Sequence, residues 1–93
     1  MIESFAGPAT ETIWRGGQAP ELPPSIHRTA LRKLRILNRV AELRDLRVPP
    51  NNKLHPLKAD RAGQHAIWIN DQYRLCFRWE GHDAFEVEII DCH

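Results

Sequence analysis

Apolar side chains recur at every second position through most of the last third of the sequence. In residues 73–79 aromatic and aliphatic side chains alternate with Arg and Cys, and in residues 85–89 apolar side chains alternate with Glu. A period of two sends successive side chains to opposite faces of a strand. The pattern therefore predicts two antiparallel strands, joined near Gly81, that together bury one apolar face.

The register of these strands follows from keeping the buried face wholly apolar. A hairpin loop with an odd number of residues, or a bulge, achieves this. The expected pairs are Trp79 with Phe85, Phe77 with Val87 and Leu75 with Ile89 on the apolar face, and Arg78 with Glu86 and Arg74 with Ile90 on the other. Arg74 is then expected beside the last residues of the chain. Cys76 and Cys92 come about 13 Å apart along the strands, which is too far for a disulfide.

A long helix is predicted upstream, from Pro24 to Leu46. Its apolar side chains are spaced by three or four residues, and four arginines fall on the opposite side. The apolar set is Ile26, Ala30, Leu34, Leu37 and Ala41, and the basic set is Arg28, Arg32, Arg35 and Arg39. Pro49-Pro50 prevents the helix from continuing.

The remaining elements complete an α+β fold with the order β-α-α-β-β-β. Met1–Phe5 is expected to form a first strand, Thr10–Arg15 a short helix that ends at Gly16-Gly17, and Gln64–Ile69 a strand followed by a tight turn at Asn70-Asp71. We expect a small, mostly antiparallel sheet with the helices packed on one face. The 93 residues are enough for one domain, residues 1–93, and not for two.

Charge is unevenly distributed along the chain. Residues 25–61 have a balance of +7, whereas residues 1–24 and 62–93 have balances of −2 and −4. Such segregation suits a polyanionic partner on one side of the molecule, or it reflects a solvated basic helix face. No apolar segment approaches the roughly 20 residues that span a bilayer, and no signal peptide is recognisable, so a cytoplasmic protein without membrane contact is expected. The spacing of Cys and His indicates no metal site, and no cofactor is expected.

Three parts of the chain carry residue types that suit metal-free cleavage of RNA. They are the basic segment 52–61, expected to be a loop, with His55 and Lys58; the strand residue Arg74; and the terminal His93. RNA cleavage requires one proton to leave the attacking 2′-hydroxyl, one to reach the 5′-oxygen, and cations to stabilise the phosphate. The alternatives are a solvated loop, a cross-strand pair of Arg74 with Glu88, and an incidental terminal histidine.

Several motifs, in order along almost the whole chain, resemble the HigB subfamily of the RelE/ParE toxin superfamily, also called plasmid-maintenance killer proteins. They are Met-Ile-x-Ser-Phe at the start, residues 44–52, Leu54-His55-Pro56-Leu57-Lys58, residues 61–65, residues 70–77 and Val87-Glu88-Ile89-Ile90-Asp91-Cys92-His93. The resemblance implies a RelE-like fold and a ribosome-dependent mRNA endonuclease that acts in the decoding site of the small subunit. It also implies a helix-turn-helix antitoxin similar to HigA, through which the complex contacts operator DNA.

The resemblance also implies roles for individual residues. Lys58 and Arg74 match phosphate-binding cations, and His55 matches a histidine at the cleft. Asp91 and His93 match the acidic residue and the general acid or base of a terminal Asp-Tyr-His. The four helix arginines, Arg28, Arg32, Arg35 and Arg39, would contact ribosomal RNA, or else form a solvated face.

One position departs from the family, because Cys92 stands where Tyr is usual. Tyr stacks on a base and donates from its hydroxyl, whereas Cys does neither well. The departure predicts weaker base stacking, with lower activity or an altered codon preference. Two other functions remain open: a ParE-like toxin that acts on a protein such as gyrase without cutting RNA, and a weakened toxin kept as an antitoxin-binding regulator.

Overall fold

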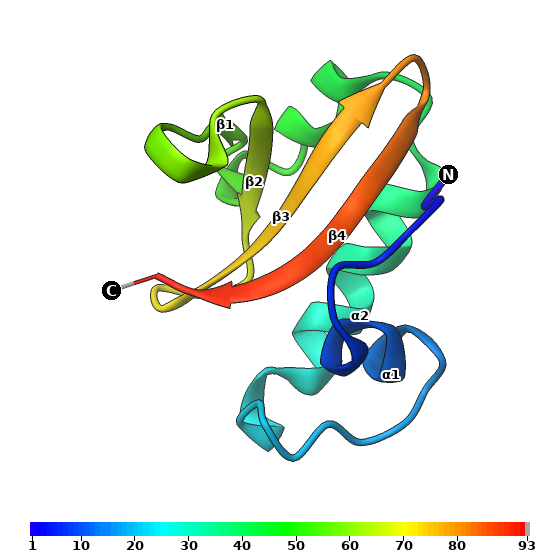
Figure 1. Ribbon diagram of the computed structural model, residues 1–93, viewed down its shortest axis with the longest axis vertical. Coiled ribbons are helices and arrows are strands. Elements are labelled where there is room, and N and C mark those ends of the chain that lie inside the picture. Colours follow the sequence, from blue (N-terminus) through cyan, green and yellow to red (C-terminus); the bar gives the residue numbers. More distant parts are fainter. Residues whose placement is uncertain (93) are drawn as a thin grey trace.

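A computed structural model describes residues 1–92 of the chain, in which two helices lie against a four-stranded sheet (Figure 1). The helices are α1 (Pro8–Trp14) and α2 (Pro24–Arg39), and the strands are β1 (His55–Pro56), β2 (Gln64–Trp68), β3 (Tyr73–Glu80) and β4 (Asp83–Asp91). Three short 3-10 helices lie between α2 and β2: η1 (Leu43–Arg47), η2 (Pro50–Asn52) and η3 (Ala59–Arg61). The α+β architecture predicted from the sequence is confirmed.

The sheet has the order β1-β2-β3-β4, and all neighbouring strands are antiparallel. The pairs Leu75–Ile89 and Arg74–Ile90 are as predicted. Between Asn70 and Tyr73 the chain turns tightly, because the Asn70 side-chain oxygen accepts hydrogen bonds from the backbone N–H groups of Gln72 (2.9 Å) and Tyr73 (2.7 Å). The last residues of β4 therefore lie beside the start of β3.

The register differs from the prediction nearer the hairpin. The loop has an even length, with Glu80 paired with Asp83, and Trp79 lies opposite Ala84 rather than Phe85. A bulge between the two halves restores the apolar face, and Glu86 supplies its extra residue with a φ of 55°. Arg78 is consequently not opposite Glu86, although its guanidinium still lies 3.6 Å from the Glu86 carboxylate.

The predicted long helix is too long, because α2 ends at Arg39 and Val40 has an extended backbone. At about 100° per residue, Leu46 in a continued helix would point about 180° away from Leu37. Both side chains are fully buried, which requires the chain to turn between them. After this turn η1 begins with a capping box between Glu42 and Asp45. Ala41, predicted to face the core, is exposed.

The N-terminal segment runs beside β4, as Figure 1 shows, but it does not form the regular strand that was predicted. It makes two isolated parallel bridges, Ile2 with Ala84 and Phe5 with Val87. The bulge at Glu86 interrupts the ladder between them, and there the Ser4 hydroxyl accepts a hydrogen bond from the Glu86 N–H (2.9 Å). The segment thus covers the far edge of β4.

The apolar core lies between the sheet and the helices. Buried side chains of α2 pack against β3 and β4, and those of α1 against β4 and α2. Within residues 1–92, no helix combines the length and the apolar character needed to cross a bilayer. Both α1 and α2 lie on this one side of the sheet.

Candidate functional site

Arg74 belongs to the face of the sheet that the helices do not cover. Its strand neighbours Leu75 and Tyr73 lie in the core, and a period of two sends Arg74 to the opposite side. Across the sheet Arg74 pairs with Trp68 of β2 and Ile90 of β4. We call this side the open face.

Arg74 is held firmly although it is charged, and only 8% of its surface is exposed. Its Nη1 donates to the backbone oxygens of Asn70 (2.6 Å) and Tyr73 (3.2 Å), and its guanidinium carbon lies 3.8 Å from the Trp68 ring centroid. The Lys53 ammonium lies 3.7 Å from the same centroid. Two cations this close to one ring must occupy opposite faces, since they would otherwise overlap. Trp68 therefore separates two cations and stabilises both by cation–π contact.

His55 lies in β1, at the edge of the sheet, and is half-buried. Its Nδ1 is 2.8 Å from the backbone oxygen of Lys53. A carbonyl oxygen can only accept, so Nδ1 carries a proton and donates it. The other ring nitrogen, Nε2, is therefore the one that can accept or release a proton at the surface.

Lys58 follows His55 by three residues and is exposed. The segment 52–61 is more ordered than the predicted loop, since it contains η2, β1 and η3. Pairing of His55 with Ala66 fixes β1 to the sheet, and Lys58 caps η3 through its backbone oxygen, which accepts from the Arg61 N–H (3.1 Å). Among the described residues, the Lys58 ammonium has no ion-pair or hydrogen-bond partner, so it remains available to an anion.

Gln72 fixes the end of β4. Its side-chain nitrogen donates to the Asp91 carboxylate (3.0 Å), and its backbone oxygen accepts from the Cys92 N–H (2.6 Å). Asp91 pairs with Tyr73, the residue next to Arg74, as the predicted register requires. Cys92 is exposed at this end. His93, the candidate acid or base, lies outside the described residues.

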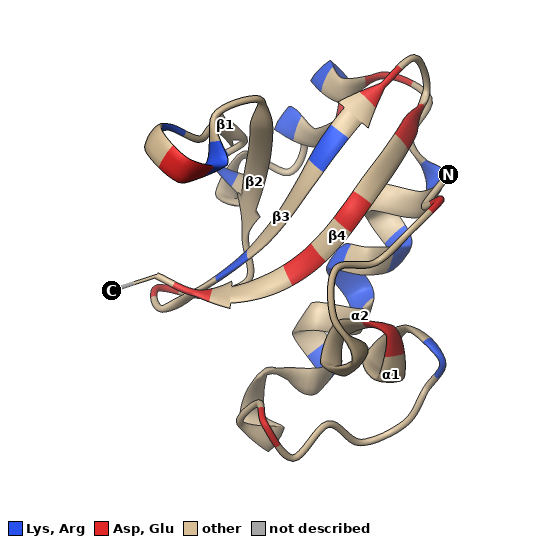
Figure 2. Cartoon of the chain, viewed as in Figure 1, with Lys and Arg blue, Asp and Glu red and all other residues tan. Residues whose placement is uncertain are grey.

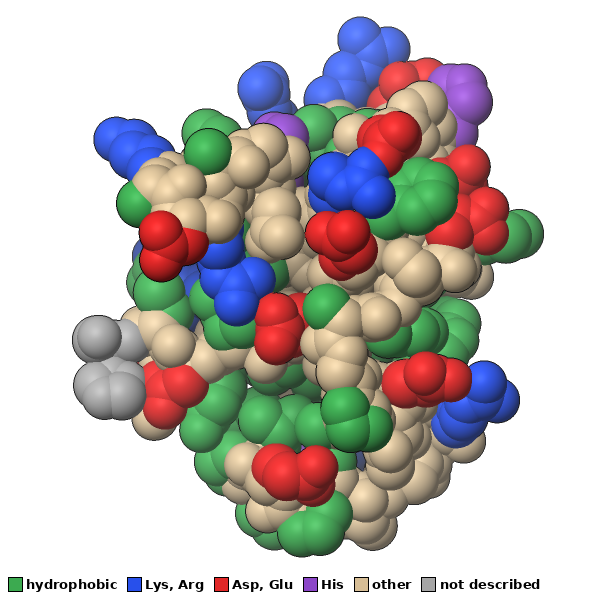
Figure 3. Space-filling view, viewed as in Figure 1, with side chains coloured by type: hydrophobic (Ala, Val, Ile, Leu, Met, Phe, Trp, Pro, Cys, Tyr) green, Lys and Arg blue, Asp and Glu red, His purple; other side chains and the backbone are tan. Residues whose placement is uncertain are grey.

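Glu88, proposed above as an alternative partner of Arg74, is paired instead with Arg61 at 3.1 Å. This pair and those of Arg78 explain why acidic and basic side chains lie next to one another on the side shown in Figure 3. Both cysteines are free, as predicted. Burial raises the pKa of Cys76 to about 11, so this thiol is protonated near neutral pH and unreactive. Within residues 1–92, no group of three or more His, Cys, Asp and Glu side chains is placed to hold a metal ion.

The four arginines of α2 that were expected to contact ribosomal RNA are all exposed. They lie apart from the open face. They belong to the helix layer, whose basic positions Figure 2 shows along α2 on the other side of the sheet. The structure therefore places His55 and Arg74 on the open face, in β1 and β3, and Asp91 and Cys92 at the end of β4, with Asp91 opposite Tyr73. It separates all of them from Arg28, Arg32, Arg35 and Arg39.

The sequence motifs did not identify Trp68, which lies next to Arg74, or Lys53, which lies over the same indole ring. The register of β2 against β3 could have revealed Trp68, because the turn at Asn70-Asp71 places it opposite Arg74. Lys53 gave no comparable signal, since its contact depends on a left-handed backbone (φ 48°) after η2.

The model of a family described as the RelE-like toxin of the type II toxin-antitoxin system HigB matches residues 3–93. A protein of Vibrio cholerae named Toxin HigB-1 is 41% identical over 58 residues, which are 62% of this chain and 61% of that relative, less than two thirds of its length. A Proteus vulgaris protein named Endoribonuclease HigB is 27% identical over 93 residues, covering 100% of both chains.

Two solved structures share the fold. YafQ from E. coli BL21(DE3) aligns with a TM-score of 0.56 at 17% identity, covering 98% of this chain and 91% of YafQ. A YoeB/ParE toxin from Agrobacterium tumefaciens aligns with a TM-score of 0.52 at 16% identity, covering 96% of each chain. At these identities the likeness concerns the fold, and it confirms the RelE-like architecture that the sequence motifs implied.

Proposed function

Because this chain belongs to the family of HigB-like, RelE-like toxins of type II toxin-antitoxin systems, we propose that it is an endoribonuclease that inhibits translation by cutting mRNA on the ribosome. The name of the Proteus vulgaris relative, Endoribonuclease HigB, supports the reaction type. The observation that carries the proposal is that Arg74 and His55 both lie on the open face of one sheet, where Arg74 pairs with Ile90 near the end of β4.

The proposed reaction moves two protons and exchanges one bond. The 2′-hydroxyl loses a proton and its oxygen bonds to phosphorus, while the bond from phosphorus to the 5′-oxygen breaks and that oxygen gains a proton. Negative charge grows on the phosphate in the transition state, and preorganised cations lower its energy. Arg74 is preorganised by Trp68 and by two backbone oxygens, which suits it to this task.

We assign Lys58 to the same phosphate as a second cation and His93 to one of the two proton transfers. His55 contacts RNA through Nε2, because Nδ1 is engaged with the backbone. Asp91 orients the end of the chain through Gln72, and we assign Cys92 to contact with a flanking base. The reaction so described uses protein groups alone.

The four arginines of α2 suit a different contact in the same proposal. They are exposed on the helix layer, so they can bind ribosomal RNA phosphates while the open face holds mRNA in the decoding site. Neutralisation by an antitoxin similar to HigA, and operator binding through that antitoxin, complete the proposal in line with the family. The protein would then act in the cytoplasm.

Mapping of mRNA 5′ ends after induction tests the proposal. Wild type is expected to produce new ends in phase with translating ribosomes, and His93→Ala is expected to remove them. Ribosome-phased cuts that persist in His93→Ala would exclude His93 from the mechanism. Growth arrest with intact mRNA would favour a non-nucleolytic, ParE-like action, and the absence of growth arrest would favour a weakened toxin kept for antitoxin binding.

A further inference from the structure

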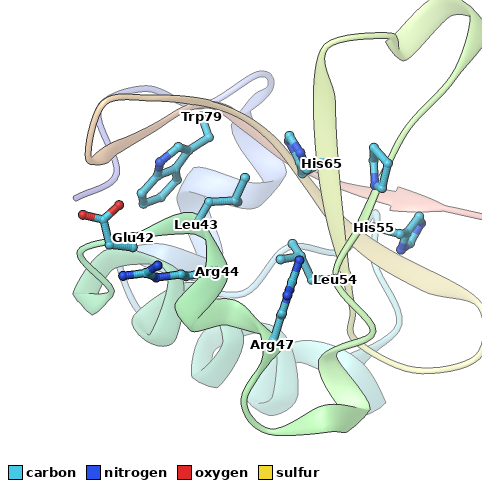
Figure 4. A pocket seen from close by; sticks show the side chains of 9 residues that line it. Glu42, Leu43, Arg44, Arg47, Leu54, His55, His65 and Trp79 are labelled. Carbon is cyan, nitrogen blue, oxygen red and sulfur yellow. The ribbon is translucent and has the colours of Figure 1, made fainter.

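A cavity of about 590 Å³ lies at the corner of the molecule where η1 takes the place of α2 against the sheet. Figure 4 shows its walls: Arg44 and Arg47 come from η1, His65 and Trp79 from β2 and β3, and His55 from β1. The volume is within the range of about 300–1,000 Å³ that is usual for small-molecule sites. Of the residues that were given roles above, His55 alone lines this cavity.

Arg44 and Arg47 give the cavity an anion-binding side. Both are exposed, and among the described residues neither makes an ion pair or a side-chain hydrogen bond. The arginines elsewhere in the second half of the chain differ, since Arg61 and Arg78 are paired with Glu and Arg74 is stacked on Trp68. A free guanidinium offers planar, charged donors that match a phosphate.

His65 gives the cavity a neutral donor. Its Nδ1 is buried and has no hydrogen-bond partner among the described residues, so Nε2 is the ring nitrogen that can face the cavity. Burial, and to a lesser extent the nearby His55, lowers the pKa of His65, which leaves the ring neutral near pH 7. A buried N–H without an acceptor is rarer than a buried acceptor without a donor. The single proton therefore belongs on Nε2, where a ligand can accept it.

Trp79 and Glu42 supply the remaining features. The Trp79 indole is half-buried and fixed, because its Nε1 donates to the Gly81 oxygen (2.9 Å) and its ring packs edge-on against Phe77. Glu42 adds a carboxylate that can accept from an amino group. The cavity thus combines cations, an aromatic surface, a donor and an acceptor.

We propose that this cavity binds one nucleotide of the RNA, beside the nucleotide that is cut. The guanidinium groups of Arg44 and Arg47 bind its phosphate, and its base lies against Trp79 with its polar edge near His65 and Glu42. An acidic peptide would match the two arginines, but it would leave the Trp79 indole without a role.

Continuity with the open face supports this occupant. His55 belongs both to the proposed cleavage site and to the wall of the cavity. The strand between the two sites, β1, has only two residues, so a bound RNA passes from one to the other around the edge of the sheet. The inference rests on the proposed function, and it predicts that the cavity contributes to the choice of cleavage site.

Nuclear magnetic resonance of the indole N–H groups tests binding directly. The probes are the four nucleoside 5′-monophosphates, with inorganic phosphate and the tripeptide Glu-Asp-Glu as comparisons at equal ionic strength. We expect at least one nucleotide to shift the Trp79 signal in a saturable way, and neither comparison to do so. Arg44→Gln and Arg47→Gln should each weaken binding about ten-fold, and Arg15→Gln, at the residue after α1, should leave it unchanged.

Three results overturn the inference: a Trp79 signal that no nucleotide moves, a shift that survives Arg47→Gln undiminished, or a shift caused by the acidic tripeptide and by no nucleotide. Mapping of 5′ ends separates this inference from the proposed function. Normal cutting by wild type with an unmoved Trp79 signal overturns the cavity alone. Intact mRNA with a nucleotide-dependent shift overturns the proposed cleavage and supports the cavity.

Discussion

The Arg74 guanidinium lies over the Trp68 indole, with 3.8 Å between its central carbon and the ring centroid. The contact joins neighbouring strands, because the two residues are direct partners in the β2–β3 register. Lys53 occupies the opposite side of the same ring at 3.7 Å. One aromatic side chain therefore positions two cations on the open face.

Trp68→Leu tests this positioning. Each cation–π contact contributes about 0.5–2 kcal/mol, so loss of both is expected to lower kcat/KM for mRNA cleavage on ribosomes about ten-fold. Trp68→Phe keeps an aromatic face and should stay within about three-fold of wild type. A role for Trp68 in stability alone would instead lower the thermal midpoint of Trp68→Leu without changing the activity of the folded protein.

The exposed arginines of α2 are expected to make ribosome binding depend on salt concentration. Each lost phosphate contact reduces the slope of log affinity against log salt by about 0.7–0.9. The double variant Arg32→Gln/Arg35→Gln should therefore bind ribosomes with a slope smaller by about 1.4–1.8. The control is Arg15→Gln, which changes an exposed arginine that follows α1 and is paired with Glu11. Equal slopes in wild type and the double variant would identify the α2 arginines as a solvated face.

Cys92→Tyr restores the side chain that is usual in the family. Cys92 is exposed, and its backbone is tethered to Gln72, so a larger side chain can be accommodated without disturbing the core. Stacking on a base contributes about 1–3 kcal/mol, and we expect cleavage to rise about ten-fold or the preferred codon to change. The measurement compares the initial cleavage rates and the mapped mRNA 5′ ends of wild type and Cys92→Tyr. Unchanged rates and sites would show that position 92 does not contact RNA.

The sequence predicted the sheet well where a single physical rule was sufficient. The alternation over residues 73–90 determines which side chains are buried, and hence the Leu75–Ile89 pair and the place of Arg74 beside the chain end. It did not locate the bulge, with which Ala84 rather than Phe85 joins the apolar face and Phe85 lies opposite Arg78. The bulge depends on a left-handed backbone at Glu86, and the sequence has no glycine there that would have indicated it.

The end of α2 and the contact between Lys53 and Trp68 depend on tertiary structure. Periodicity extended α2 through Ala41, but burial of Leu46 beside Leu37 requires a turn that the local pattern does not reveal. The strand pattern placed Arg74 correctly on the sheet, whereas His55 was expected in a loop and lies in β1. Lys53 reaches Trp68 only because of the loop geometry after η2. Contacts made between distant segments are the part that periodicity cannot supply.

Asn52 joins α2 to the segment that carries His55. It is fully buried, and its amide donates to the backbone oxygens of Leu46 (3.0 Å) and Val48 (3.3 Å). Its side-chain oxygen accepts from the Lys33 ammonium, whose pKa is lowered first by burial and then by Arg32. Asn52→Ala leaves this ammonium buried without its acceptor, and we expect a loss of about 3 kcal/mol in unfolding free energy.

Urea denaturation measures that loss. The matched control is Asn51→Ala, since Asn51 is the preceding residue and is exposed; it should change stability by less than about 0.5 kcal/mol. Equal losses for the two variants would mean that the buried hydrogen bonds of Asn52 do not stabilise the fold.

His65 predicts how stability changes with pH. Its pKa in the folded protein is lowered, mainly by burial and then by His55, whereas the unfolded chain has the ordinary value of 6.5. As the pH falls through this value the unfolded state takes up a proton before the folded state does, so acidification favours unfolding. The contribution of neutral His65 to the unfolding free energy is fully present above pH 6.5, and it is lost once the pH has fallen below the pKa of the folded protein.

The variant His65→Gln lacks this contribution. The difference in unfolding free energy between wild type and variant should therefore shrink as the pH is lowered from neutrality. Parallel stability curves across this range would show that His65 titrates equally in both states, and would remove the argument for a neutral Nε2–H donor in the cavity.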